Sequence, residues 1–515
     1  MLSLGSNISA TQAVEAKYSA SLDGTDDYIN LDSFASLLSD DMAFSLSIWF
    51  KGSLNTGEGS NILFSAHNAT YGNVIRIGVD ASGSTANKGI FYSDASTSNH
   101  GGIGSTDLDD GEWHNLIVTR PAGAGGQQGK IYIDGGSALT TYLHDVDPSW
   151  TSATRVSIGQ EYDDAAPSGI TDLYEGKIGE VGFWNVELND TSRLKVYNFG
   201  KPLNLTFDQG DYDNSSDLIG YWRMGNGFFD DKANGIIHDQ GNAVTGSELV
   251  TNGNFSADSG WVEGTGYDIG SGTMSYDGSG SQYGRIRQGL TTEIGATYEL
   301  KFTLSNLSAS SVNFGFGKSS GSFSGLEQKT YSSNGTHTRR MVATLSDHSI
   351  VVQNNSATQT LDIDDVSVKK VSTPGFGAEL APSSLSIVNG SGGGTITQVS
   401  GNSYSSTSDG NNSSVIRPKF DFNTESGKTY KLVITPTGSI TGTVHFDFND
   451  GSSYLFRDYD FTTTKEIYFT DNGTVFGAFN GQQVYSISGF TISLKKLNGN
   501  PGLTSGGVTF SSDTP

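Results

Sequence analysis

The sequence predicts an all-β protein made of three tandem β-sandwich (jelly-roll) domains. Short runs that alternate apolar and polar residues recur along all 515 residues, separated by Gly, Asn, Asp and Ser. Glycine is abundant, with 68 residues, and no long stretch has a helical period. A chain of this length exceeds what one core can organise, so several domains are expected.

Composition narrows the classes of function. The net charge of −25 argues against a nucleic-acid partner, since a polyanion would be repelled. The chain has no cysteine, which excludes disulfides and thiolate chemistry. No apolar run approaches the roughly 18 residues that a membrane helix requires, so no membrane insertion is expected. The first 21 residues lack the basic and apolar regions of a secretory signal, and residues 1–15 are interpreted as an attachment or flexible segment.

The first domain, residues 16–246 with its connector, is organised around residues 107–135. An Asp-Gly turn leads into a strand at Trp113–Arg120, a nine-residue glycine-rich loop follows, and a second strand runs over Lys130–Asp134. Apolar residues occupy both faces of the first strand, so both faces should be partly buried: Leu116 and Val118 on one, Trp113 and Ile117 on the other. Further strands are expected at 44–50, 61–65, 74–79, 89–92, 155–159, 176–188 and 217–227, with a short helical turn at 189–197.

Three phrases in this domain point to a family. They are DGTDDYI (23–29), DGEWH (110–114) with IYIDG (131–135), and GKIGEVGFWNVEL (176–188). Together they resemble the laminin-G-like, concanavalin-A-like jelly roll, a fold used mostly to bind sugars and cell surfaces. The resemblance implies a calcium ion at a loop end, where Asp26, Asp27, Asp109 or Asp163 are candidate ligands. Turn formation and solvation of these carboxylates is the alternative.

The same fold also occurs in glucanases, so an enzyme is the alternative to a binding protein. A retaining glycosidase needs two carboxylates about 5 Å apart. Closely spaced Glu and Asp at alternating positions of one strand would supply them, and the sequence has no such strand. It also has no Gly-x-Ser-x-Gly elbow that leads into a helix, and no HExxH. We therefore expect a protein that is not an enzyme.

The remaining chain repeats itself. The segment GATYELKF (295–302) returns as GKTYKLVI (427–434), an offset of 132, and VSVKKV (366–371) returns as ISLKKL (492–497), an offset of 126. Matching turns and strands at a nearly fixed spacing predict two copies of one β-sandwich. We place them at 247–373 and 377–498, joined by a Pro-Gly linker. Residues 499–515 are rich in Gly, Ser and Thr and are expected to be a flexible C-terminal tail.

The first copy carries LVTNGNF (249–255), the Gly-x-Thr-Tyr-x-Leu strand and IDDVSV (363–368). These motifs resemble the carbohydrate-binding jelly rolls often appended to xylanases. The resemblance implies a structural calcium that joins the first strand to the last, held by Asn252, Asn254, Asp364 and Asp365. The second copy has LAPSS and GFTISL in their place, so this implication does not extend to it.

Sugar binding is the leading expectation. Sugars present apolar C–H faces that stack on aromatic rings and hydroxyls that pair with Asp, Asn and Gln. The first copy holds four aromatics within 23 residues, which we take as the candidate platform: Trp261, Tyr267, Tyr276 and Tyr283. Weaker candidates are Tyr71, His67 and Tyr162 with Asp163 and Asp164 in the first domain, and Tyr404, Tyr454, Phe456 and Tyr459 in the second copy. Any single aromatic is more often part of a core.

Tandem adhesive modules without cysteine, strongly acidic and without an export signal, are similar to structural proteins of tailed bacteriophages. Marine phage fibres and appendages in particular have laminin-G-like domains that open with such a phrase. The resemblance implies a virion surface protein that binds host or environmental glycans, contacts other virion proteins and forms a homo-oligomer, most often a trimer. Two alternatives stay open: an extracellular bacterial adhesin or carbohydrate-binding protein exported without a leader, and a virion module without a ligand.

Overall fold

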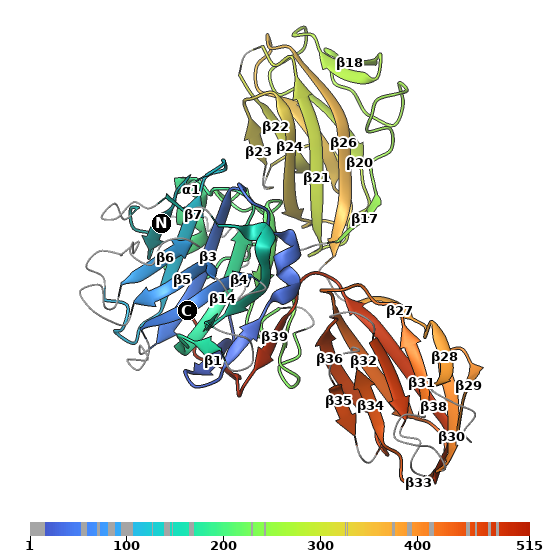
Figure 1. Cartoon of the computed structure of the whole chain (residues 1–515). Coiled ribbons are helices and arrows are strands. Elements are labelled where there is room, and N and C mark those ends of the chain that lie inside the picture. The colour runs from blue at the N-terminus through green and yellow to red at the C-terminus, as the bar shows by residue number, and fades with distance from the viewer. Residues whose placement is uncertain are drawn as a thin grey trace, which may run out of the picture.

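The structure, a computed structural model, consists almost wholly of strands and forms three β-sandwiches (Figure 1), which confirms the predicted fold class. It describes residues 16–52, 59–68, 73–80, 88–93, 107–125, 127–138, 145–146, 148–163, 169–227, 230–241, 244–308, 310–324, 326, 328–372, 376–388, 394–410, 417–449, 454–458, 461–471, 475–479 and 484–515. The expected attachment segment, 1–15, lies outside these residues. Within them, no helix is long and apolar enough to cross a membrane.

The first sandwich consists of two seven-stranded sheets, here called A and B. Sheet A runs in the order β40 (Thr509–Ser511), β1 (Ser19–Asp23), β14 (Glu175–Trp184), β3 (Phe44–Gly52), β7 (His114–Arg120) and β9 (Lys130–Ile133), with β15 (Leu218–Trp222) also paired to β14. Sheet B runs in the order β16 (Ile236–Ile237), β39 (Gly502–Ser505), β2 (Tyr28–Asn30), β11 (Ala153–Ile158), β4 (Ser60–Asn68), β5 (Asn73–Asp80) and β6 (Gly89–Ser93).

Sheet A is buried on both faces, as predicted from its apolar pattern. On the inner face of β7, Leu116 and Val118 join the main core between the sheets. On its outer face, Ile117 joins a second, smaller core with Trp184 and Tyr221. The segment after β14, which includes helix α1 (Asp190–Tyr197), covers this outer face. The expected helical turn at 189–197 is thereby confirmed.

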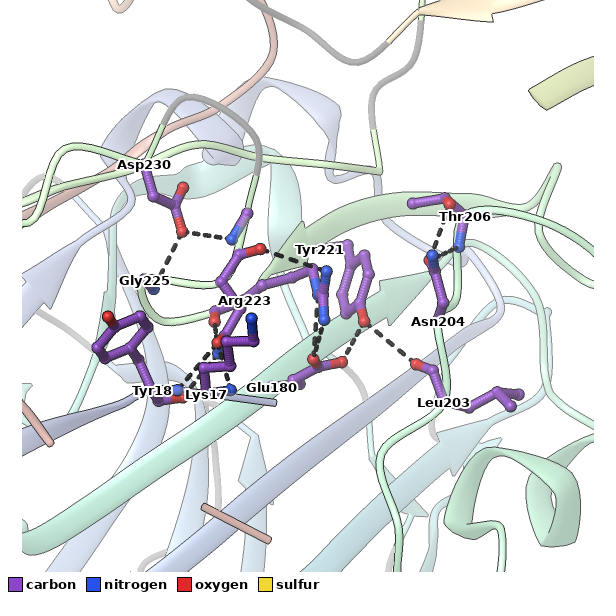
Figure 2. A network of polar contacts seen from close by, with 12 residues as sticks. Lys17, Tyr18, Glu180, Leu203, Asn204, Thr206, Tyr221, Arg223, Gly225 and Asp230 are labelled. Atoms are coloured by element: carbon purple, nitrogen blue, oxygen red, sulfur yellow. Dashed lines mark hydrogen bonds and ion pairs between the residues drawn. The ribbon is translucent and has the colours of Figure 1, made fainter. Parts of the chain in front are cut away.

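A buried polar network lies on the outer face of sheet A (Figure 2). Arg223 donates to Glu180 Oε1 from Nε at 3.0 Å and from Nη2 at 2.8 Å, and the Tyr221 hydroxyl donates to Glu180 Oε2. Asn226 extends the network to the start of the described chain, where its side chain binds the backbone of Tyr18. A buried ion pair is tolerated because its remaining lone pairs and protons are hydrogen-bonded.

The C-terminal tail is not a flexible end, contrary to the prediction. Strand β40 pairs with β1, and β39 pairs with both β2 and β16, so the tail adds a strand to each sheet of the first sandwich. In Figure 1, β39 lies in red beside the blue N-terminal strands. Phe510 and Val508 pack against the main core, and Asp513 pairs with Lys177 at 2.5 Å. The tail is ordered despite its small, polar residues because it pairs with two sheet edges that would otherwise be open and because its apolar side chains are partly buried.

The second sandwich lies within residues 244–372. One sheet runs β18 (Tyr267–Gly270), β19 (Thr273–Tyr276), β26 (Leu361–Ser372), β21 (Thr297–Ser305) and β24 (Gly335–Val342), with β17 (Val244–Glu248) also on β26. The other runs β20 (Arg285–Gly289), β25 (Ser349–Asn354), β22 (Val312–Gly317) and β23 (Lys329–Tyr331).

The third sandwich follows the same plan. One sheet runs β29 (Gly394–Ser400), β30 (Ser403–Asp409), β38 (Val484–Leu497), β32 (Thr429–Pro436) and β36 (Lys465–Thr470), with β27 (Phe376–Leu380) and β33 (Ile440–Gly442) also on β38. The other runs β28 (Ser384–Val388), β31 (Arg417–Phe422), β37 (Val475–Phe479), β34 (Phe446–Asn449) and β35 (Tyr454–Asp458).

The two repeats also share a side-chain motif, which lies just before β21 in the first repeat and just before the equivalent strand β32 in the second. In the first repeat the Tyr298 hydroxyl accepts a hydrogen bond from the Glu293 amide at 2.9 Å, and Lys370 pairs with the Glu293 carboxylate. In the second, Tyr430, Glu425 and Lys496 repeat both contacts, at 2.8 Å each. These matching contacts agree with the two copies expected from sequence.

Candidate functional site

A cluster of charged side chains lies beside sheet B of the first sandwich. Strand β11 ends at Ile158, and Gly159, with φ +92°, turns the chain into a small hairpin of β12 (Glu161–Tyr162) and β13 (Ile170–Thr171). A Cβ at Gly159 would collide with Leu22, so only glycine fits this turn. The turn directs Glu161 inward, where its residue is only 2% exposed.

Arg76 and Asp172 complete the cluster, here called the Glu161 cluster. Arg76 Nη1 lies 3.0 Å from Glu161 Oε1 and 4.0 Å from Asp172 Oδ2. Asp172 has a left-handed backbone, φ +49°, and its Oδ1 accepts from the Ser60 amide at 3.2 Å. Glu161 Oε2 is buried and has no hydrogen-bond partner among the described residues. A buried carboxylate oxygen left in this way is costly unless a proton or a cation meets it.

The pKa of the Glu161 carboxyl indicates the same cost. Burial above all raises the pKa to about 8; Arg76 opposes it, whereas the charge of Asp172, a hydrogen bond with Asp172 and the charge of Asp163 add to it. One guanidinium therefore contacts two carboxylates, and a third lies near enough to act on Glu161. Oxygen-rich, acidic loops at a sheet end are the donor set that calcium prefers, so the residues present fit a bound cation.

Aromatic side chains lie next to this cluster, but they are buried. The Tyr162 amide donates to His67 Nε2 at 3.3 Å, and the two rings meet edge to face at 5.6 Å. The Arg155 guanidinium donates to the Tyr162 hydroxyl at 2.7 Å and lies over the ring. The sequence grouped His67 with Tyr162 correctly, yet neither ring is open to stack on a sugar.

The predicted calcium ligands Asp26 and Asp27 do lie together, and Asp23, which the sequence analysis did not name, joins them. One carboxylate oxygen of each lies within 4.8 Å of the others. Backbone amides already use these oxygens: Asp27 accepts from Asp23 at 3.0 Å and from Gly507, and Asp23 accepts from Thr25 at 2.8 Å. The contacts explain the DGTDD phrase as a turn that receives the returning tail. Calcium at this turn stays a prediction.

The second predicted calcium site is brought together only in part. The Val366 amide donates to Gly253 O at 2.9 Å, so the segments with Asn252, Asn254, Asp364 and Asp365 do meet. Their side chains are engaged locally, however. Asn252 donates to two carbonyls of its own loop, Asn254 accepts from Ser256, and Asp364 accepts from the Asp365 amide. Calcium here also stays a prediction.

The predicted sugar platform is wrong for three of its four residues. Trp261, Tyr267 and Tyr276 belong to the core of the second sandwich, because the strands and the preceding loop turn them inward. Tyr283 alone is exposed, at 55%, with a left-handed backbone. In the third sandwich Tyr404 is a core residue. Tyr71, Asp164, Tyr459 and the side chains of Tyr454 and Phe456 lie outside what the structure describes.

The sequence analysis missed Glu161, Arg76 and Asp172. The three come from separate strands and loops, and only the pairing of β4 with β5 and β11 brings them together. The one local signal was Asp163, a named neighbour that also acts on the pKa of Glu161.

The comparison with protein families gives a class for the first sandwich. Residues 23–192 match the family Laminin_G_3, described as the concanavalin A-like lectin/glucanases superfamily. The match covers about a third of the chain and includes every residue of the Glu161 cluster. The first sandwich is thus similar to this superfamily, as the sequence phrases indicated. No relative was found among curated proteins.

Solved structures give weaker likenesses. A heptameric SAP-like pentraxin from Limulus polyphemus is 16% identical, with 36% of this chain and 82% of that chain covered and a TM-score of 0.27. The tandem CBM22 domains of Paenibacillus barcinonensis Xyn10C are 9% identical, over 49% and 98%, with a TM-score of 0.19. The NanB sialidase of Streptococcus pneumoniae is 11% identical, over 92% and 98%, with a TM-score of 0.24. Similarities as low as these support no statement about function.

Proposed function

We propose that this chain is a glycan-binding protein without enzymatic activity, and that its first sandwich binds a sugar through a calcium ion at the Glu161 cluster. The observation that carries the proposal is the buried Glu161 Oε2, which has no hydrogen-bond partner among the described residues, while Glu161 and Asp172 share one guanidinium. The family match at residues 23–192, to a superfamily that includes lectins, supports the sugar.

Glu161 and Asp172 would hold the cation, and Asp163 at the exposed rim would add negative charge beside it. Calcium takes six to eight oxygen ligands, more than these side chains supply, so hydroxyl oxygens of a sugar can fill the remaining positions. Arg76 would keep the Glu161 and Asp172 carboxylates oriented through its contacts at 3.0 and 4.0 Å. Weak sites of this kind become effective when many copies act together.

The test is calcium titration by calorimetry, followed by a glycan array with calcium and with chelator. The variant is Glu161→Gln. Since the pKa of about 8 leaves Glu161 largely protonated at pH 7 without a cation, glutamine imitates that state and should keep the fold. Glu187→Gln is the matched control, because Glu187 pairs with Lys130 at the surface of the same sandwich.

We expect wild type and the control to bind calcium with equal affinity and to bind glycans only in calcium. The Glu161→Gln variant should lose at least tenfold in calcium affinity and lose the calcium-dependent glycan signal. Equal calcium binding by all three proteins, or a glycan signal unaffected by chelator, would contradict the site.

We further propose that the protein acts at the surface of a virion, as a fibre, appendage or decoration component that assembles as a homo-oligomer. Support comes from the acidic, cysteine-free composition and the tandem sandwiches. An extracellular bacterial adhesin is the alternative. Mass spectrometry of purified particles and the identity of neighbouring genes separate the two: tail or capsid genes favour the virion, and polysaccharide-utilisation genes favour the adhesin.

A further inference from the structure

An open cleft of about 950 Å³ lies between the first and third sandwiches. One wall is formed by Tyr28, Asn30 and Arg155 on β2 and β11. The facing wall is the turn at 426–428 together with Thr470 of the third sandwich. Neither sandwich forms this cleft alone.

The tail strand β39 forms part of the cleft. Residues 503–505 line it, and β39 is paired there with β2, so that Tyr28 lies opposite Ser505 and Asn30 opposite Leu503. The same strand follows β38 of the third sandwich after only a few residues. The chain that links the two sandwiches therefore holds the walls close, and Lys428 Nζ bridges them by donating to Ser36 Oγ at 3.2 Å.

The lining has the chemistry of a sugar site. Thr470 and Ser505 offer hydroxyl groups that both donate and accept, as sugar hydroxyls require, and Asp32 holds the Asn30 amide in place beside them. Tyr28 adds a half-buried aromatic ring, fixed edge to face against Tyr162 at 6.3 Å between ring centroids. A fixed ring is a suitable surface for the apolar face of a sugar.

The charges in the cleft select among sugars. Arg155 is balanced by Asp32, at 2.9 Å between Nε and Oδ2. Lys428, in contrast, meets the neutral Ser36 hydroxyl across the cleft. The charged side chains of the lining are Asp32, Arg155 and Lys428, so the lining has one positive charge in excess within a chain of net charge −25. The carboxylate on the same turn as Lys428, that of Glu425, is paired with Lys496, so the Lys428 ammonium can pair with a carboxylate of a ligand.

We propose that this cleft binds an acidic oligosaccharide, a sugar chain with uronic acid carboxylates, with Lys428 pairing with a carboxylate and Tyr28 stacking on a sugar ring. The proposal shares glycan recognition with the proposed function but adds a second site. This site needs no calcium, because its charge is supplied by a lysine rather than by a cation at the Glu161 cluster.

The probes are tetragalacturonate and its neutral counterpart, a galactose tetrasaccharide, titrated into the full chain by calorimetry in chelator. The variants are Lys428→Met and Tyr28→Ala. Lys419→Met is the matched control, since Lys419 belongs to the same sandwich, pairs with Asp421 and does not line the cleft. Thermal unfolding checks that each variant is folded.

Wild type and the control should bind tetragalacturonate at least tenfold more tightly than the neutral tetrasaccharide, and this binding should weaken as salt is added. Lys428→Met should lose about tenfold in affinity for the acidic probe and gain nothing for the neutral one. Tyr28→Ala should weaken both. Glu161→Gln should leave this binding unchanged, which separates this site from the calcium site. The proposal is overturned if wild type shows no preference for the acidic probe, or if folded Lys428→Met binds it as wild type does.

Discussion

The first sandwich and the two repeats behind it are built on different principles. In each repeat, all strands come from one continuous stretch of about 130 residues, and the core is closed within it. The first sandwich needs both ends of the described chain, because β1 and β2 pair with β40 and β39 almost 500 residues away. The repeats are therefore inserted between the parts of one domain, and the order of domains along the chain is not the order in which they can be completed.

The two kinds of sandwich also differ in what they bury. The first sandwich contains a buried ion pair, Glu180 with Arg223, that does not contact the other two sandwiches in the described part of the chain. In the second, the buried Arg339 and Arg340 face the first sandwich instead, where Arg340 donates its amide to Asp208 at 3.2 Å. The first sandwich thus combines a buried ion pair with a distant strand pair, whereas the core of the second combines apolar packing with neutral polar contacts such as that of Asn354 with Tyr267.

The largest effect is expected from removing residues 499–515, which tests whether the first sandwich, unlike the repeats, depends on strands from the C-terminal tail. The truncated chain loses β39 and β40, and with them the pairing of two sheet edges and the packing of Phe510 and Val508. We expect the calorimetric transition of the first sandwich to fall by more than about 10 °C or to vanish, because several kcal/mol are lost from one domain. The transitions of the repeats should remain.

The control for the truncation is Asp513→Asn in the full chain. Lys177 and Lys51 hold the pKa of Asp513 at about 2, yet the side chain is partly exposed, so its loss should cost only about 1 kcal/mol. A truncated protein whose transitions all match wild type would show that the first sandwich does not need the returning strands.

Breaking the buried ion pair with Arg223→Met should destabilise the first sandwich less than truncation does. The change leaves the Glu180 carboxylate buried without its guanidinium, at a cost of about 3–5 kcal/mol in the free energy of unfolding. Figure 2 shows Glu180 in contact with both Arg223 and Tyr221, and the Tyr221 hydroxyl also meets Leu203 O in the segment that covers sheet A. Denaturant unfolding monitored for the first sandwich measures the loss.

Lys130→Met is the comparison for that variant. Its partner, Glu187, is 2.7 Å away at the surface, and such pairs contribute about 1 kcal/mol or less. If both substitutions cost the same, the buried network would have no special role in the first sandwich.

The parts of the fold that depend on local pattern were predictable. Alternation located β3, since Phe44, Leu46 and Ile48 alternate toward the core, and a direct repeat revealed the two later sandwiches. The tail was not predictable in this way. Its strands are three and four residues long, and their partners are the edges of a domain that is distant in sequence, so no local signal exceeds the flexible composition.

The candidate site shows the same limit. Composition indicated aromatic platforms, but alternation within short strands places Tyr267 and Tyr276 on the inner face just as readily as on the outer one. The Glu161 cluster depends on register between β4 and β5 and on a turn at Gly159, which a single sequence does not reveal. Charges that meet across strands can be found only once the pairing is known.

The smallest expected effect concerns His114, which joins the turn before β7 to the turn after β9. Its Nδ1 lies 2.7 Å from Asp134 Oδ2 and its Nε2 3.1 Å from Asp110 Oδ1, so the charged ring can donate to both carboxylates. These contacts, that with Asp134 above all, raise the pKa of His114 above its usual value, against the effect of burial.

A pKa raised in the folded state means that the folded protein binds the proton more tightly than the unfolded chain. The stabilisation is therefore complete below the usual pKa of about 6.5 and is lost as the pH rises through the raised value. We expect the difference in unfolding free energy between wild type and His114→Gln to be largest at pH 5 and to shrink toward pH 9. Other groups that titrate in this range, such as Glu161, are present in both proteins, so their contribution cancels in the difference between the two unfolding free energies. A difference independent of pH would mean that the neutral ring holds the two turns by packing alone, and that the first sandwich relies on charge only at its buried pair.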